Sequence, residues 1–292
     1  ELRRPLGGAG CERREQTEGV IPPRRVFEIV LELALFLFVF VGCLCYHREN
    51  RARNALKQEE AVMEKIKLEV AGIPAVLYGK RSRRVYLYVH GKNGSAAEAA
   101  RFARTACPAG WQVLAVDLPE HGTRKDSPEK LVPWVVTREL QAVYARMQSV
   151  WKHIRVYGVS IGAWFAMQAL QTQQPEKALL VSPIVDMENL ILDLMQQAGV
   201  TEEQLRTAGE IPTAMGETLS WPYLCWVREH PLHWKVPTQV LYADTDPLTG
   251  HAAMEQFRRQ TGAHLTILEG GEHWFHTETQ LAALQSWEEH NC

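Results

Sequence analysis

The sequence predicts an α/β fold with a mostly parallel central sheet and helices on both faces. Short β-branched and aromatic runs, typical of buried strands, alternate with longer segments rich in Ala, Gln, Glu and Leu, which favour helices. The alternation begins near residue 63 and continues to the end of the chain. With 292 residues, of which 46% are hydrophobic, the chain is long and apolar enough for one large core.

The strands and helices are expected in a regular order. Lys65–Val70 and Ala75–Tyr78 are expected to form a hairpin that turns at Gly72. The later strands are expected at Arg84–His90, Gln112–Asp117, His153–Gly158, Lys177–Ser182, Thr238–Ala243 and His264–Leu268. The helices are expected at Ala96–Ala106, Val132–Met147, Ala163–Gln171, Ala252–Gln260 and Trp274–Glu289.

Residues 184–235, which follow the sixth strand, are too many for an ordinary connection and predict an inserted helical cap. Its helical signals are an apolar i, i+4 face and a capping box formed by Thr201 and Gln204. The face consists of Leu190, Ile191, Leu194 and Met195. A dense, mainly aromatic group follows it, made up of Trp221, Tyr223, Leu224 and Trp226. This group is expected to line an acyl pocket, to pack the cap onto the body, or both.

Charge and cysteine content exclude several classes of protein. The 32 Lys and Arg residues against 34 Asp and Glu give a net charge of −2, so no nucleic-acid partner is expected. The six cysteines show no C-x-x-C spacing, which argues against a zinc ribbon, a redox dithiol and a disulfide scaffold. Two H-x-x-H pairs, at 230–233 and 273–276, lack a clear third ligand. We therefore expect neither a metal nor a cofactor.

Residues 1–62 form an N-terminal extension with a hydrophobic segment at about 29–46. This segment is short for a membrane span, and arginines flank it on both sides, so the charges give no orientation. Gln58-Glu59-Glu60 can be encoded by a bacterial ribosome-binding sequence, and Met63 follows at a suitable distance. We expect Met63 to be the true start, which makes 63–292 a cytoplasmic domain. The alternative is a genuine membrane anchor, and a membrane partner is expected only in that case.

Gly158-Val159-Ser160-Ile161-Gly162 stands directly between a predicted strand and a predicted helix. A serine on such a turn is exposed for attack, because glycines on either side remove side chains that would collide. The amino end of the following helix brings free N–H groups and a positive dipole close to the reacting oxygen. Ser160 is therefore the candidate nucleophile.

A second strand ends in His90-Gly91-Lys92-Asn93-Gly94. A glycine-containing loop at this position can offer a backbone N–H to the oxyanion that forms on a substrate carbonyl. The backbone N–H groups of Lys92 and Ile161 are the expected donors of this oxyanion hole.

These motifs resemble the α/β-hydrolase superfamily over roughly residues 84–292, in particular its lipase, esterase and serine-aminopeptidase members related to monoacylglycerol lipases. His90-Gly91 fits the HG oxyanion loop of the family, and Asp117-Leu-Pro-Glu-His-Gly122 fits its D-x-P-x-H-G turn, with Glu120 in place of the usual Gly. The resemblance implies the α/β-hydrolase fold and a triad in the chain order serine, acid, histidine.

Both remaining triad members are expected at strand ends. The acid is Asp246 or Asp244, and the family pattern G-x-x-D favours Asp246, with Ala243 standing where glycine is usual. The base is His273, which follows Gly270-Gly271, and His276 is a nearby alternative. The acid orients the imidazole, which accepts the serine proton and returns it to the leaving group.

These residues predict a serine hydrolase that cleaves a carboxylic ester, thioester or amide with an apolar acyl group through an acyl-enzyme on Ser160. Its partner is a small-molecule ester or acyl substrate, and carboxylic esters are favoured. An aminopeptidase would need an acid near the cap to hold an amino group, and Glu217, Glu229 and Asp186 are available. A non-catalytic hydrolase fold used for binding is the other alternative.

Overall fold

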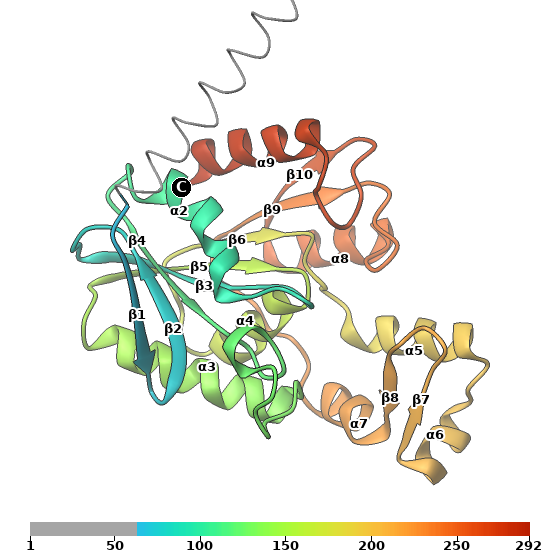
Figure 1. Ribbon diagram of the computed structural model, residues 1–292. Helices are drawn as coiled ribbons and strands as arrows, with labels where there is room; N and C mark the ends of the chain where they lie inside the picture. Colours follow the sequence, from blue (N-terminus) through green and yellow to red (C-terminus); the bar gives the residue numbers. More distant parts are fainter. Residues whose placement is uncertain (1–62) are drawn as a thin grey trace, which may run out of the picture. The chain divides into compact units, whose positions relative to one another are not determined.

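An eight-stranded sheet forms the centre of the described part of the chain, residues 63–292 of a computed structural model (Figure 1). The strands are β1 Lys65–Val70, β2 Ile73–Tyr78, β3 Arg84–Val89, β4 Gln112–Val116, β5 His153–Val159, β6 Ala178–Val181, β9 Thr238–Ala243 and β10 His264–Leu268. Their order is β1-β2-β4-β3-β5-β6-β9-β10. β1 and β2 form an antiparallel hairpin, β2 runs antiparallel to β4, and the other pairs are parallel. The predicted strands and the mostly parallel sheet are confirmed.

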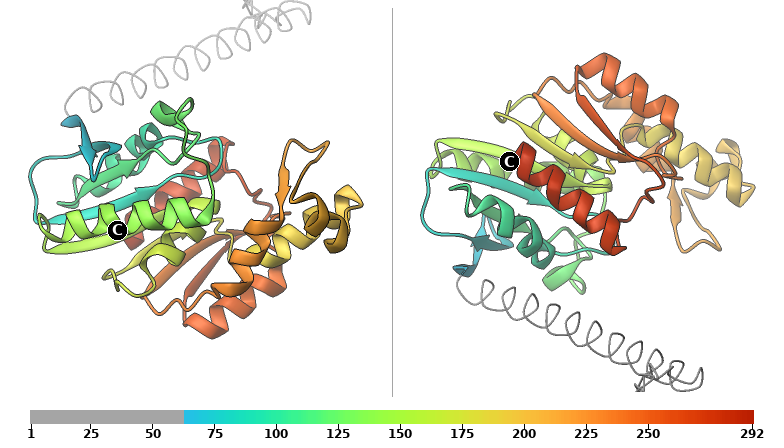
Figure 2. Two further views of the ribbon diagram at one scale, coloured as in Figure 1. Left: turned by 90° about the horizontal axis from the view of Figure 1, so that it is seen from below. Right: turned by 90° about the horizontal axis from the view of Figure 1, so that it is seen from above.

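Helices cover both faces of this sheet (Figure 2). They are α2 Ala99–Ala106, α3 Pro133–Gln148, α4 Ile161–Leu170, α8 His251–Thr261 and α9 Glu278–Asn291, with short 3₁₀ turns at Ala96–Glu98 and Gly122–Arg124. Successive side chains of a strand point to opposite faces. Val85, Leu87 and Val89 of β3 accordingly pack in the core with α3, α4 and α8, while Tyr86 and Tyr88 pack with α2 and α9. Burial on both faces explains why β3 reads as a continuous apolar and aromatic run.

The expected start of the last helix, Trp274, is wrong. α9 begins at Glu278 because Thr277 caps it: the Gln280 N–H donates to Thr277 Oγ1 at 3.2 Å, and the Thr277 N–H donates to Gln280 Oε1 at 3.4 Å. Residues 274–277 therefore remain a loop, which leaves His273 on a loop between β10 and α9.

A cap lies between β6 and β9, as predicted, and is seen at the lower right of Figure 1. It consists of α5 Met187–Ala198, α6 Glu202–Ala208, a hairpin of β7 Glu210–Pro212 and β8 Thr218–Ser220, and α7 Trp221–Glu229. The capping box is confirmed, because the Gln204 N–H donates to Thr201 Oγ1 at 3.2 Å and the Thr201 N–H donates to Gln204 Oε1 at 2.8 Å. The small hairpin is an element that the sequence analysis did not predict.

The N-terminal extension 1–62, with its hydrophobic segment at about 29–46, lies outside the described residues. Within residues 63–292, no helix combines the length and the apolar character that a membrane crossing requires.

Candidate active site

Ser160 lies on a tight turn between β5 and α4. Its backbone has φ 51° and ψ −124°, a strained conformation for a residue other than glycine. The close approach of the turn to its neighbours requires the two glycines: a Cβ on Gly158 would lie 2.6 Å from Cα of Ala163, and one on Gly162 would lie 2.1 Å from the His90 carbonyl oxygen. The Ser160 N–H donates to the Val181 carbonyl at 3.0 Å, which fixes the turn to β6.

A chain of hydrogen bonds joins Ser160, His273 and Asp246. Ser160 Oγ lies 2.8 Å from His273 Nε2, and His273 Nδ1 lies 2.7 Å from Asp246 Oδ2. The Asp246 side chain is fully buried, and its other oxygen accepts the N–H groups of Leu248 at 2.8 Å and Thr249 at 3.2 Å. Such a buried and fully bonded carboxylate holds the imidazole in one orientation, with Nε2 facing the serine.

The structure separates the two pairs of alternatives that the sequence left open. Asp244 is exposed, whereas Asp246 turns inward, because the Asp244 N–H donates to the Leu268 carbonyl and the Thr245 N–H donates to the Gly271 carbonyl, each at 3.3 Å. His276 directs Nδ1 to the Trp274 carbonyl at 2.9 Å, away from the serine. His273 is therefore the histidine that contacts Ser160, and Asp246 is the acid that contacts His273.

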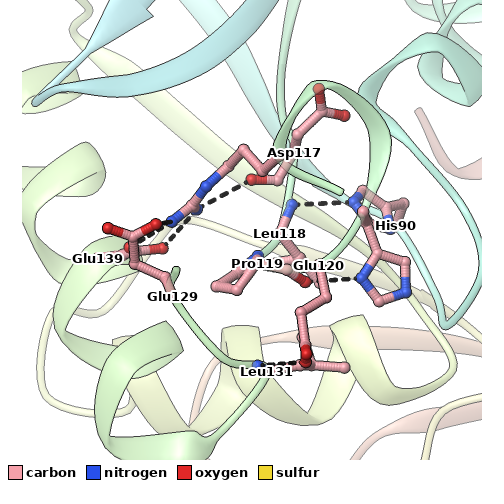
Figure 3. Close-up of polar contacts among 10 residues, drawn as sticks. His90, Asp117, Leu118, Pro119, Glu120, Glu129, Leu131 and Glu139 are labelled. Atoms are coloured by element: carbon pink, nitrogen blue, oxygen red, sulfur yellow. Dashed lines mark hydrogen bonds and ion pairs between the residues drawn. The ribbon is translucent and has the colours of Figure 1, made fainter. Parts of the chain in front are cut away.

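His90 fixes the first peptide of the loop beside Ser160. The Leu118 N–H donates to His90 Nε2 at 3.0 Å (Figure 3). In the neutral ring the proton therefore lies on Nδ1, which donates to the Gly91 carbonyl at 2.8 Å. The Gly94 N–H donates to the same carbonyl at 3.1 Å. Because the peptide is planar and trans, the Lys92 N–H at its other end points away from these donors.

Gly91 itself lies against the turn that carries Ser160, since a Cβ placed on Gly91 would be 3.3 Å from Cβ of Ser160. Directly after Ser160, α4 begins at Ile161, so the Ile161 N–H has no carbonyl acceptor within the helix. The positive end of the α4 dipole lies at the same point. The structure thus brings the loop containing Lys92 and the N–H of Ile161 close to Ser160, and the first turn of α4 lies against the same loop, because a Cβ on Gly162 would be 2.1 Å from the His90 carbonyl oxygen.

His90 gives the fold a pH-dependent stability. Burial lowers its pKa from 6.5 to about 4, although the bond to Gly91 opposes this shift. As pH falls, the unfolded chain takes up this proton first, so the contribution is complete above about pH 6.5 and is lost progressively down to about pH 4. We expect a loss of about 3 kcal/mol in the free energy of unfolding over this window.

Urea unfolding of the full chain at several pH values between 7 and 4 measures this effect. His90→Asn removes the titrating ring. The free energy of unfolding of this variant should be lower than that of wild type at pH 7, and it should fall less steeply as the pH decreases. Equal slopes for the two proteins would contradict the assignment.

One contact near the site was missed by the sequence analysis. The Lys92 side chain forms an ion pair with Glu217, which lies between β7 and β8, so the loop beside Ser160 is linked to the cap hairpin. Both side chains are partly exposed, and such pairs typically contribute 0 to about 1 kcal/mol. The two residues are 125 positions apart, and no sequence pattern connects them.

Comparison with known proteins places the chain in a family. The model of the alpha/beta hydrolase family matches residues 87–284, more than half of the chain, and the protein belongs to this family. The expected superfamily and fold are thereby confirmed. No match is found among curated proteins.

This chain is similar in fold to three solved structures, among others. Est1E from Butyrivibrio proteoclasticus, solved with ferulic acid bound, is 16% identical with a TM-score of 0.61, and the match covers 77% of this chain and 97% of that one. A thioesterase domain from the curacin biosynthetic pathway is 20% identical with a TM-score of 0.50, over 78% and 99%. The mouse alpha/beta hydrolase domain-containing protein 10 is 13% identical with a TM-score of 0.58, over 78% and 98%. At these identities, the likeness establishes the fold alone.

Proposed function

We propose that this protein is a serine hydrolase that cleaves carboxylic esters with an apolar acyl group through an acyl-enzyme on Ser160. The observation that carries the proposal is the hydrogen-bonded chain from Ser160 through His273 to the buried Asp246, set at the start of α4. These are the residue types and contacts that nucleophilic catalysis by serine requires.

In the proposed reaction, His273 Nε2 accepts the Ser160 proton as Oγ attacks the carbonyl carbon of the ester. Asp246 stabilises the imidazolium that forms. The backbone N–H groups of Lys92 and Ile161 donate to the developing oxyanion, which is the state where charge stabilisation lowers the barrier. His273 then returns the proton to the leaving alkoxide. A water molecule repeats the sequence on the acyl-enzyme, which releases the carboxylic acid and restores Ser160.

Exposed apolar side chains next to the triad support an apolar acyl group. Trp274 follows His273 directly and is 75% exposed, and Leu248 lies two residues after Asp246 and is 39% exposed. Apolar surface of this kind around a polar site favours binding of hydrocarbon.

The aromatic residues of the cap pack against α4, unlike the exposed Trp274 and Leu248. Tyr223 and Trp226 have ring centroids 6.1 and 6.0 Å from Trp164 of α4, and Leu224 is fully buried. This supports their role in packing the cap onto the body. The hydroxyl of Tyr223 is buried without a hydrogen-bond partner among the described residues.

An aminopeptidase is the competing activity, and two of its three candidate acids are already engaged. Glu217 pairs with the Lys92 ammonium, and Asp186 caps α5 by accepting the Asn189 N–H at 3.0 Å. Glu229 is exposed at the end of α7. A substrate ammonium at Glu217 or Asp186 would have to displace these contacts, which favours esters, and Glu229 is the remaining acid that an aminopeptidase could use.

A substrate panel tests the proposal. The full chain is assayed with p-nitrophenyl esters of increasing acyl length, together with aminoacyl p-nitroanilides. We expect kcat/KM to rise with acyl length over the shorter esters and to exceed that of every aminoacyl amide by at least about 100-fold, or about 2.7 kcal/mol in transition-state stabilisation. Faster cleavage of the aminoacyl amides would overturn the ester assignment.

The pair Asp246 and Asp244 offers a matched comparison. Asp246→Asn is expected to lower kcat by about 10⁴-fold, because an amide in place of the carboxylate favours the wrong histidine tautomer. Asp244→Asn, two residues away and exposed, should remain within about threefold of wild type. Steady-state hydrolysis of one ester measures both. If Asp244→Asn had the larger effect, the acid would have to be reassigned.

A further inference from the structure

His121 makes the second side-chain contact to the backbone of the loop beside Ser160. The Asn93 N–H donates to His121 Nε2 at 2.9 Å, and in the neutral ring the proton on Nδ1 donates to the Pro119 carbonyl at 2.7 Å. These two bonds define one tautomer, with an acceptor facing Asn93. His121 belongs to the D-x-P-x-H-G turn, which the proposed chemistry does not otherwise use.

His121 contacts the loop beside Ser160 at Asn93, a residue with an uncommon backbone conformation. Asn93 has φ 61°, in the left-handed region that residues other than glycine rarely adopt and that asparagine tolerates better than most. The Gly94 N–H bonds back to the Gly91 carbonyl, so residues 91–94 form a tight turn around Lys92. The bond from Asn93 to His121 holds this turn at its left-handed residue.

His90 and His121 together hold two successive peptides. His90 holds the carbonyl of the peptide between Gly91 and Lys92, and His121 holds the N–H of the peptide between Lys92 and Asn93. The two rings pack together with centroids 5.2 Å apart. The two peptides that flank Lys92 are therefore each held by a histidine ring.

The turn that carries His121 is itself well anchored. The His121 N–H donates to the Leu118 carbonyl at 3.1 Å, and the Arg124 N–H donates to the His121 carbonyl at 2.8 Å. The neighbouring Glu120 accepts the Leu131 N–H at 2.9 Å (Figure 3). His121 thus projects from a fixed support, as a residue must if it is to set the direction of a loop.

We propose that His121 is a positioning residue of the reaction: it fixes the Lys92–Asn93 peptide so that the Lys92 N–H is held ready for the oxyanion. It acts through the loop and does not touch the substrate. The inference rests on the proposed function, because an oxyanion forms only if Ser160 attacks a carbonyl. Its effect falls on kcat, since the oxyanion exists in the transition state and not in the bound ester.

Three substitutions in the full chain test this role. His121→Phe keeps a ring and removes the acceptor, His121→Gln places a side-chain oxygen near the position of Nε2, and Lys130→Gln is the control. Lys130 is exposed and pairs with Glu120 of the same turn, without contact to the loop.

The readouts are kcat and KM for one p-nitrophenyl ester and inhibition by two compounds. A trifluoromethyl ketone forms a tetrahedral adduct with the serine and needs the oxyanion hole, whereas the product carboxylic acid needs only the binding site.

We expect His121→Phe to lower kcat by about 10- to 100-fold, less than the complete loss of an oxyanion donor, with KM changed less than about threefold. Affinity for the ketone should fall in parallel, while affinity for the carboxylic acid stays the same. His121→Gln should recover most of the activity, and Lys130→Gln should match wild type.

Two outcomes would overturn the proposal: a folded His121→Phe variant with wild-type kcat, or equal losses of ketone and carboxylic acid affinity. If His121→Phe does not fold, the comparison of His121→Gln with the shorter His121→Asn decides, because only the longer side chain reaches Asn93. Equal activity of these two variants would then reject the role. Full activity of Ser160→Ala would instead reject the proposed function, so the two failures are distinguishable.

Discussion

Replacement of Ser160 by alanine is expected to abolish ester hydrolysis by the full chain. In the proposed mechanism, the substitution removes the oxygen that attacks the substrate and leaves His273 and Asp246 without a nucleophile to activate. Loss of a triad serine typically lowers kcat on the order of 10⁶-fold. Hydrolysis of a p-nitrophenyl ester by purified wild type and Ser160→Ala measures the effect.

The fold should survive this change. The hydroxyl of Ser160 contacts His273 at the surface of the turn, whereas the Ser160 N–H and carbonyl make the bonds that hold the turn in place. Ser160→Ala should therefore unfold at a temperature close to that of wild type. The neighbouring Ser182, buried at the end of β6, is not part of the hydrogen-bonded chain. Activity near wild type in a folded Ser160→Ala protein would remove Ser160 from the mechanism.

His273→Gln is the second change with a very large expected effect. Without the imidazole, no group accepts the serine proton during attack or returns it to the leaving group, and we expect kcat to fall on the order of 10⁵- to 10⁶-fold. The expected loss rests on the position of the ring: His273 Nε2 lies 2.8 Å from Ser160 Oγ, and His273 Nδ1 lies 2.7 Å from Asp246 Oδ2.

The matched control is His276→Gln, three residues further along the same loop. His276 stacks against Trp274 with ring centroids 5.2 Å apart and makes no contact with Ser160. Its replacement should leave kcat/KM within about threefold of wild type. A large loss in His276→Gln together with an active His273→Gln would assign the base to His276.

The fold and the turn that carries Ser160 could be predicted because their signals are local. The strand ending at Val159, the turn at Ser160 and the helix starting at Ile161 follow one another directly, so a single short stretch carries the whole pattern. β3 was recognisable because burial on both faces demands apolar residues at every position. The start of α9 was missed, because the apolar residues Trp274 and Phe275 extended the helical pattern past its cap at Thr277.

Other parts of the site depend on contacts that sequence patterns do not encode. Asp244 and Asp246 differ in burial because of contacts between segments: their loop bonds to the loop of His273, and Asp246 itself accepts bonds from Leu248, Thr249 and His273. The bond between Asn93 and His121 joins residues 28 positions apart, with no periodicity to reveal it. The resemblance to the family identified the D-x-P-x-H-G motif, but only the folded chain shows what its histidine contacts.

The most direct test of the central claim is the site of covalent labelling by a fluorophosphonate. The full chain is treated with the reagent, and its intact mass and its peptide map are measured. Ser160 activated by His273 should react with the phosphorus, so we expect a single phosphonyl group on the peptide that contains Ser160, and none on His273→Gln over the same time. The absence of labelling in folded wild-type protein would favour a hydrolase fold used for binding, and a label on another residue would contradict Ser160 as the nucleophile.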